Sequence, residues 1–256
     1  MADGAGITAT AKLKTQAVDI SNYRNDFPIL KKTNIAYLDS ASSAQKPQCV
    51  IDSYKNLYEN NYANIHRGLY KFSQETTQAY EVVRSKVATF INAKTENEII
   101  FTRNTTEAIN LVAQSWGRSH LRAGDEIIIT EMEHHANIVP WQLLETQIGV
   151  KVKVAPIHDD GTLDFGALVS LFSERTKFVS IVHASNALGT INPVAKVIKA
   201  VKNFNSDILT LVDGSQSIVH GSIDVQSIGC DFFAFTGHKI YGPNGVGVLY
   251  GRSKIL

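Results

Sequence analysis

Four side chains that could take part in chemistry each lie at the end of a short apolar run of this sequence or shortly after it. Lys239 comes directly after a histidine, Asp213 ends its run, and His134 and His135 stand side by side. Alone, a lysine is usually a solvated surface residue, an aspartate before glycine a turn residue, and a histidine a structural one. Together, an amine, a carboxylate and a flat ring are what a Schiff-base lysine requires for covalent chemistry on a carbonyl group.

The elements that would position these residues are short β-branched runs alternating with longer helical patterns, which is typical of α/β architecture. Most of the runs are apolar on both faces, as in a sheet that helices cover on two sides. The predicted strands are Glu98–Thr102, Glu126–Thr130, Val150–Ala155, Phe178–His183, Ile208–Asp213, Asp231–Phe235 and Val246–Tyr250.

Start signals predict helices between these strands. Asn104 stands three positions before Glu107, a capping pattern that predicts a helix start ahead of residues 108–116. Further helices are predicted over 165–172 after a cap at Asp164, from Pro193 in the first turn towards Asn203, and over Ser73–Asn92 with apolar residues at 83, 87, 90 and 91.

In such a sheet, ligands gather beyond the carboxyl ends of the strands, where helix N-termini offer free N–H groups. Pyridoxal phosphate needs an amine for its aldehyde, a carboxylate for its pyridine nitrogen, donors for its phosphate and a flat group over its ring. Thr105 and Thr106 suit either a helix start or a phosphate, since both uses need a hydroxyl beside free N–H groups. The polar residues that follow the strands are Thr105, Thr106, Glu133, His134, His135, Ser185, Asn186, Asp213, Ser215, Gln216, Thr236, His238 and Lys239.

A metal site is the alternative use of these acidic and histidine residues. His134 and His135 are adjacent, so they cannot both point the same way from an extended segment, and no H-E-x-x-H or similar spacing occurs. We therefore predict no metal site. The side chains considered as metal ligands are those of Glu131, Glu133, His134, His135, Asp213 and His238.

Composition narrows the class of protein. The 256 residues include 25 Lys and Arg against 24 Asp and Glu, a net charge of +1 that argues against a nucleic-acid partner. Hydrophobic residues make up 44%, which suits one large globular domain rather than a disordered chain. No apolar run approaches the roughly 20 residues of a membrane span, so we predict no membrane association.

The cysteine count and the N-terminus bear on location. Cys49 and Cys230 are the two cysteines, too few for a disulfide framework, and a reducing compartment is the simplest interpretation. The first 20 residues resemble neither a secretory signal nor a typical transit peptide, and we predict a flexible tail over residues 1–26. The expected location is the cytoplasm, with an organelle as the alternative.

Five motifs together resemble the pyridoxal-phosphate-dependent cysteine desulfurases, most of all the SUF-type branch that also includes selenocysteine lyases. The resemblance runs from about Phe27 to the last residue and implies the large domain of a fold-type I transferase over 27–256, with a mostly parallel seven-stranded sheet and helices on both faces. The motifs are His-Arg-Gly (66–68), Arg-Asn-Thr-Thr-Glu (103–107), Glu-His-His-Ala-Asn (133–137), Val-Asp-Gly-Ser-Gln (212–216) and Thr-Gly-His-Lys-Ile-Tyr-Gly-Pro (236–243).

The resemblance implies a role for each site residue. Lys239 would bind the aldehyde of pyridoxal 5'-phosphate and carry the substrate's Cα proton, Asp213 would pair with the pyridine nitrogen, and His134 would stack on the ring. The other implied cofactor residues are Gln216 and Asn186 near the phenolic oxygen, and Thr106, Thr236 and His238 at the phosphate. Thr105, beside Thr106, is a further implied cofactor-binding residue. His66 and Arg67 would lie at the site entrance, near substrate, or at a subunit contact.

The implied reaction takes sulfur or selenium from L-cysteine or L-selenocysteine, leaves L-alanine and forms an enzyme persulfide for iron–sulfur cluster assembly. The implied partners are a second copy of the chain and a sulfur-acceptor protein. Members of this family continue into a smaller C-terminal domain with the nucleophilic cysteine and a carboxylate-binding arginine. Neither Cys49 nor Cys230 matches that cysteine, so we expect this chain to be a fragment with incomplete catalytic machinery.

Two alternatives stay open. Other class V enzymes share the lysine, the aspartate and the stacking histidine, so an aminotransferase, a kynureninase-like enzyme or an epimerase fits the same residues. A non-catalytic module that binds the cofactor or a partner subunit is the competing class. The His-Arg-Gly and Glu-His-His-Ala-Asn motifs favour the desulfurase.

Overall fold

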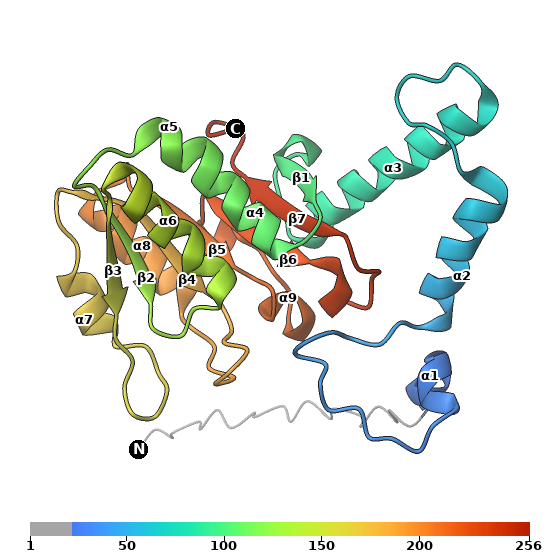
Figure 1. The fold of residues 1–256 in the computed structure, drawn as a ribbon, viewed down its shortest axis with the longest axis horizontal. Coiled ribbons are helices and arrows are strands. Elements are labelled where there is room, and N and C mark those ends of the chain that lie inside the picture. The colour runs from blue at the N-terminus through green and yellow to red at the C-terminus, as the bar shows by residue number, and fades with distance from the viewer. Residues whose placement is uncertain (1–21) are drawn as a thin grey trace, which may run out of the picture.

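The computed structural model describes residues 22–256, whose centre is a single seven-stranded sheet (Figure 1). The strand order is β1-β7-β6-β5-β4-β2-β3, and β7 alone runs antiparallel to its neighbours, β1 and β6. The remaining pairs, β6 with β5, β5 with β4, β4 with β2 and β2 with β3, are parallel. The strands are β1 (Ile99–Thr102), β2 (Glu126–Thr130), β3 (Lys151–Ala155), β4 (Thr176–Val182), β5 (Leu209–Asp213), β6 (Phe232–Thr236) and β7 (Gly247–Gly251).

Helices connect the strands. The α-helices are α1 (Pro28–Lys31), α2 (Gln48–Asn56), α3 (Lys71–Phe90), α4 (Thr105–Val112), α5 (Arg118–His120), α6 (Val139–Ile148), α7 (Phe165–Ser170), α8 (Val194–Phe204), α9 (Ser217–His220) and α10 (Val225–Ile228). Short 3₁₀ segments cover Asn22–Asp26, Glu96–Glu98, His135–Asn137 and Gly237–Lys239, and π-helical turns cover Leu57–Asn61 and Ala113–Gly117.

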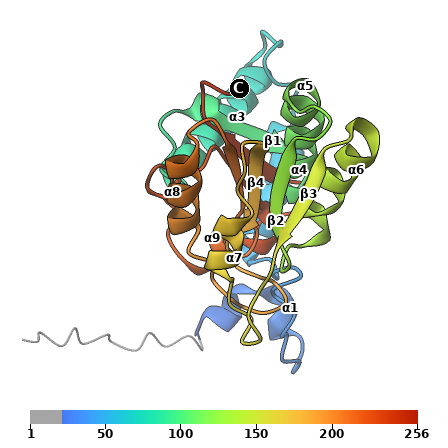
Figure 2. The same cartoon turned by 90° about the vertical axis from the view of Figure 1, so that its left-hand side faces the viewer.

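Strand residues alternate between two hydrophobic cores, one on each face of the sheet. In β2, Ile127 and Ile129 belong to one core and Ile128 to the other, because successive side chains of a strand point to opposite faces. Figure 2 shows α4, α5 and α6 on one side of the sheet and α7, α8 and α9 on the other. The prediction of an α/β sheet with helices on both faces is therefore confirmed.

All seven predicted strands are present, each within two residues of its expected ends. Two predicted caps are also present: Asn104 Oδ1 accepts a hydrogen bond from the Glu107 N–H at 2.8 Å, and Asp164 Oδ1 accepts one from the Ala167 N–H at 2.8 Å. The helix after Asp164 ends at Ser170, two residues early, and the predicted 73–92 helix is α3, shifted by two residues.

Two expectations about helices were wrong in detail. Pro193 is the residue before α8 rather than part of its first turn, because its ψ of 64° is not helical. On α3, Ile91 just past the helix end is buried, but Val83 and Phe90 are about half exposed, so only part of the apolar pattern faces the sheet.

Helices α1 and α2, in the N-terminal part of the described chain, do not pack on the sheet. Figure 1 shows them at the side of the molecule, and the segment between them contacts the loop after β6, where the Ala44 N–H donates to the His238 carbonyl at 3.1 Å. No residue of α1 or α2 is buried. Residues 1–21 of the predicted tail lie outside the described residues. Residues 22–26, its last part, form a 3₁₀ turn whose Arg24 donates hydrogen bonds to the Thr33 and Ile35 carbonyls at 3.1 and 3.2 Å.

Two features are absent from residues 22–256. No helix in this range combines the length and the apolar character that crossing a bilayer requires. No three His, Cys, Asp or Glu side chains in the same range gather as ligands of a metal ion. The predicted cytoplasmic location and the predicted lack of a nucleic-acid partner stay predictions.

Candidate active site

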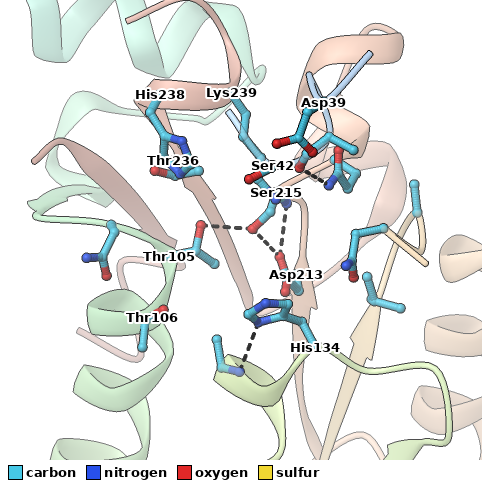
Figure 3. Close-up of a pocket in the computed structure, with 17 residues that line it drawn as sticks. Asp39, Ser42, Thr105, Thr106, His134, Asp213, Ser215, Thr236, His238 and Lys239 are labelled. Atoms are coloured by element: carbon cyan, nitrogen blue, oxygen red, sulfur yellow. Dashed lines mark hydrogen bonds between the residues drawn. The ribbon is translucent and has the colours of Figure 1, made fainter. Parts of the chain in front are cut away.

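A cavity of about 430 Å³ lies at the edge of the sheet where the parallel strands end (Figure 3). Most of its polar lining comes from the ends of β1, β2, β4, β5 and β6 and from the segments that follow them, because parallel strands bring their carboxyl ends to one edge. All nine residues predicted to bind the cofactor line it: Thr105, Thr106, His134, Asn186, Asp213, Gln216, Thr236, His238 and Lys239.

Lys239 ends a 3₁₀ turn that begins directly after β6. The turn is held by the Gly237 N–H, which donates to the Val246 carbonyl at 2.8 Å across the loop that returns to β7. Burial lowers the pKa of the Lys239 amine, and the charge of Asp213 opposes that shift. A lowered pKa raises the share of neutral amine, the form that attacks a carbonyl carbon.

Asp213 is the last residue of β5 and is 2% exposed. Its backbone carbonyl accepts from the His183 N–H at 2.9 Å, and the next residue, Gly214, donates to the Ala234 carbonyl at 2.8 Å. A Cβ on Gly214 would lie 2.0 Å from the Phe233 ring, so only glycine permits this close approach of β5 and β6. The neighbouring strands therefore fix the backbone that carries the carboxylate.

His134 reaches the cavity from the loop after β2. Its Nδ1 accepts a hydrogen bond from the Ala136 N–H at 3.1 Å, so in the neutral ring the proton is on Nε2. Figure 3 shows the ring beside Asp213, whereas His135 does not line the cavity. The two adjacent histidines thus serve different surroundings, as predicted.

Glu133 anchors the loop that carries His134. Its carboxylate accepts hydrogen bonds from Thr130 Oγ1 at 2.6 Å, Asn137 Nδ2 at 2.6 Å and the Val182 N–H at 2.9 Å. Burial raises the pKa of Glu133 to about 8 against the effect of these donors. The contacts tie the loop after β2 to the end of β4, which keeps His134 over the cavity.

At the end of the cavity away from Asp213 and His134, the lining consists of hydroxyl and imidazole groups. Thr106 lies in the first turn of α4, whose free N–H groups and dipole favour an anion, and Thr236 and His238 lie opposite it (Figure 3). Burial lowers the pKa of His238, and the charges of Lys239 and Lys46 lower it further. This end is suited to a phosphate.

One wall of the cavity was not predicted from the sequence. Asp39, Ala41 and Ser42 line it from a segment before α2, outside the α/β alternation. Gln216 Nε2 donates to the Ala41 carbonyl at 2.7 Å, and the Ala44 N–H donates to the His238 carbonyl at 3.1 Å. No periodic pattern marks this stretch, so only the fold reveals that it joins the site.

Ser215 also lines the cavity. The sequence analysis predicts no role for it, although it lies between Asp213 and Gln216 in the Val-Asp-Gly-Ser-Gln motif. Asn186 is exposed and lines the cavity from the turn after β4, and its role near the phenolic oxygen stays a prediction.

His66 and Arg67 are not brought to the cavity within this chain. They are exposed in the loop before α3, where His66 has a left-handed φ of 69° and its N–H donates to Thr77 Oγ1 at 2.9 Å. The His66 ring also packs edge-on against Tyr80, with centroids 5.8 Å apart. Their role at a substrate stays a prediction.

Comparisons with known proteins identify the family of this chain. A family model described as aminotransferase class-V matches residues 36–256. The cysteine desulfurase of Dickeya dadantii is 51% identical over 241 residues, which cover 93% of this chain and 58% of that protein. The chain therefore spans less than two thirds of the length of the curated relatives it matches.

Solved structures give the same result. The crystal structure of the cysteine desulfurase CsdA of Escherichia coli superposes on this chain with a TM-score of 0.83 at 40% identity. The match covers 92% of this chain and 58% of the CsdA chain. The apo structure of a cysteine desulfurase from Thermococcus onnurineus gives a TM-score of 0.85 at 37% identity, covering 91% and 57%. The predicted fold-type I architecture is thus confirmed. Since the family model matches most of the sequence, the chain belongs to the class-V aminotransferase family.

Proposed function

We propose that this chain is the cofactor-binding part of a cysteine desulfurase, which converts L-cysteine to L-alanine and passes the sulfur to a thiol. The observation that carries the proposal is the half-buried amine of Lys239, in one cavity with Asp213 and His134, in a chain 51% identical to a cysteine desulfurase. The same proposal covers L-selenocysteine as a second substrate.

Class-V aminotransferases and cysteine desulfurases depend on pyridoxal 5'-phosphate. The cavity fits this group in volume, because about 430 Å³ lies within the roughly 300–1,000 Å³ of small-molecule sites. It also fits in polarity, since a carboxylate lies at one end and hydroxyl groups with a helix N-terminus at the other. When bound, the cofactor supplies an electrophilic aldehyde and a ring that accepts electrons from the substrate.

The chain's own residues then have separate tasks. Lys239 would hold the cofactor aldehyde and move the Cα proton of the substrate, and Asp213 would keep a positive charge on the pyridine nitrogen. His134 would cover the ring and exclude water from one face. At the remaining positions, Gln216 and Asn186 would bind near the phenolic oxygen, and Thr106, Thr236 and His238 would bind the phosphate.

The thiolate that takes the sulfur is proposed to come from outside these 256 residues. Neither of the two cysteines lines the cavity: Cys49 is exposed on α2 and Cys230 is buried before β6. Burial raises the pKa of the Cys230 thiol to about 12, so it stays protonated and a poor nucleophile. A sulfur-acceptor protein and a role in iron–sulfur cluster assembly follow from the proposed reaction.

The decisive experiment is a product assay on the full-length protein that carries this chain, loaded with pyridoxal phosphate. With L-cysteine and a reductant, we expect L-alanine and sulfide in equal amounts, and with L-selenocysteine, L-alanine and selenide. Adding a 2-oxo acid distinguishes a desulfurase from an aminotransferase, the main alternative. Formation of a keto acid from cysteine, in place of alanine, would identify an aminotransferase and contradict the proposal. Cofactor binding without turnover of either amino acid would support the non-catalytic module instead.

We further propose that the protein forms a homodimer through the region around α2. Tyr54, Tyr58 and Tyr62 make an exposed ladder of rings along this region, with successive centroids 5.3 and 5.1 Å apart. Adjacent aromatic rings exposed to solvent are unusual on a free protein surface, and tyrosine is enriched at protein–protein interfaces. In a dimer, the His66 loop could meet the site of the other copy, which its exposed position permits.

Light scattering on the full-length protein tests the dimer. We expect twice the mass of one chain, and a shift to the monomer in Tyr54→Glu/Tyr58→Glu, because two buried carboxylates without partners would weaken the contact. Val154→Glu on the edge strand β3, also about half exposed, is the matched control and should stay dimeric. A monomeric wild type, or equal behaviour of both variants, would contradict this assignment.

A further inference from the structure

Three buried side chains at the cavity form a continuous hydrogen-bonded chain that no sequence motif predicts. Ser215 Oγ lies 2.6 Å from Asp213 Oδ1 and 2.9 Å from Thr105 Oγ1, and the residues are 8%, 2% and 6% exposed (Figure 3). Thr105 and Ser215 are 110 positions apart in the sequence. The contact therefore joins the start of α4 to the end of β5.

The direction of each hydrogen bond follows from the number of protons. An ionised carboxylate can only accept, so the single hydroxyl proton of Ser215 goes to Asp213 at the shorter distance of 2.6 Å. The contact at 2.9 Å can then exist only if Thr105 donates its proton to Ser215 Oγ. Thr105 has no second proton, so in this arrangement its hydroxyl cannot also donate to a phosphate.

The two carboxylate oxygens of Asp213 are used differently. Oδ1 accepts from the Ser215 hydroxyl and also from the Ser215 N–H at 2.9 Å. Oδ2 accepts no hydrogen bond from the side chains and backbone groups of residues 22–256. With the backbone held by β4 and β6, two side-chain torsions set the plane of this carboxylate, and the last of them is soft.

We propose that Thr105 and Ser215 are positioning residues that fix the plane of the Asp213 carboxylate and leave Oδ2 for the pyridine nitrogen of the cofactor. This inference rests on the proposed function. Ser215 holds one oxygen with two donors, and Thr105 holds the Ser215 hydroxyl in the orientation that reaches Asp213. Thr105, predicted to bind the cofactor, then acts through Asp213, and the phosphate is left to its neighbour Thr106, which lines the same cavity.

The test uses the full-length protein loaded with pyridoxal phosphate carrying ¹⁵N in its ring. The ¹⁵N chemical shift reports whether the ring nitrogen is protonated, independently of turnover. In Ser215→Ala we expect the signal to move towards the unprotonated value, and turnover to fall by about 10- to 100-fold, the size expected when a hydrogen bond to a charged group is lost. Cofactor retention should change little.

Thr105→Val, which keeps the shape of the side chain, should move the ¹⁵N signal in the same direction by a smaller amount, and Thr105→Ser should restore it. Because Thr105 acts through Ser215, the double variant Thr105→Val/Ser215→Ala should match Ser215→Ala alone. Thr106→Val is the matched control: it should release the cofactor faster without moving the ring-nitrogen signal.

Four outcomes would overturn the inference. An unchanged ¹⁵N signal in folded Ser215→Ala would show that the serine does not orient Asp213. Additive effects of the two substitutions, or a Thr105→Val variant that behaves like Thr106→Val, would assign Thr105 to the phosphate. A wild-type protein that binds no pyridoxal phosphate would contradict the proposed function itself and this inference with it, a result distinct from the other three.

Discussion

Lys239→Ala is expected to abolish both the absorbance band of the lysine-bound cofactor and measurable turnover. The variant removes the amine that would attack the aldehyde and the base that would move the Cα proton, and no other group can replace a covalent nucleophile at the same place. Borohydride reduction followed by mass spectrometry of the peptide containing residue 239 should find the cofactor mass in the wild type and not in the variant.

The matched control is Lys46→Ala. Lys46 is also partly buried beside the site, where its Nζ donates to the His238 carbonyl at 3.0 Å, and burial lowers its pKa as well. It does not line the cavity, so this variant should keep the band. A band that survives in Lys239→Ala but disappears in Lys46→Ala would move the attachment point to Lys46.

The lowered pKa of Lys239 also predicts how cofactor capture depends on pH. Only the neutral amine attacks the aldehyde, so the rate at which the cofactor-free protein binds pyridoxal phosphate should rise with pH and level off near the pKa of Lys239. Because burial places that pKa below the ordinary 10.5, the plateau should come at a lower pH than for a free lysine side chain. Stopped-flow absorbance at a series of pH values measures this rate.

Asp213→Asn is expected to lower turnover by about 10²- to 10³-fold, the size seen when a preorganised group facing developing charge is lost. The amide is neutral, so it cannot balance a positive charge on the ring nitrogen. If its oxygen keeps the two Ser215 hydrogen bonds, its NH₂ group faces the protonated ring nitrogen, and two donors then face each other without an acceptor. The phosphate contacts are untouched, so the dissociation constant of the cofactor should rise by less than about tenfold, a smaller loss than that of one charged hydrogen bond.

Steady-state kinetics and cofactor titration on the same preparations separate the two effects. Asp39→Asn is the matched control, because Asp39 is the other carboxylate that lines the cavity. Its loss should reduce turnover far less, since Asp39 is exposed whereas Asp213 is buried at the end of a central strand. Equal kinetics in Asp213→Asn and the wild type would leave Asp213 only a structural role before Gly214.

Local signals in the sequence were enough to predict much of this fold. The β-branched runs lie within two residues of the seven strands, because the central strands are buried on both faces and need apolar residues almost throughout. Asn104 and Asp164 were recognisable as helix caps because a cap depends on contacts within three residues. Nine cofactor candidates were identified for a related reason: parallel strands carry whatever follows them to one edge.

The tertiary structure decided what depends on contacts between distant residues. The reversal of β7 between β1 and β6, the approach of residues 39–44 to Gln216 and His238, and the Thr105–Ser215 contact join segments that no local pattern relates. The same holds for His66 and Arg67, which one chain leaves outside its own cavity. Side-chain type and spacing determined which chemistry was available, whereas packing of distant segments determined which atoms of Asp213 and Lys239 face the cavity and which groups hold them there.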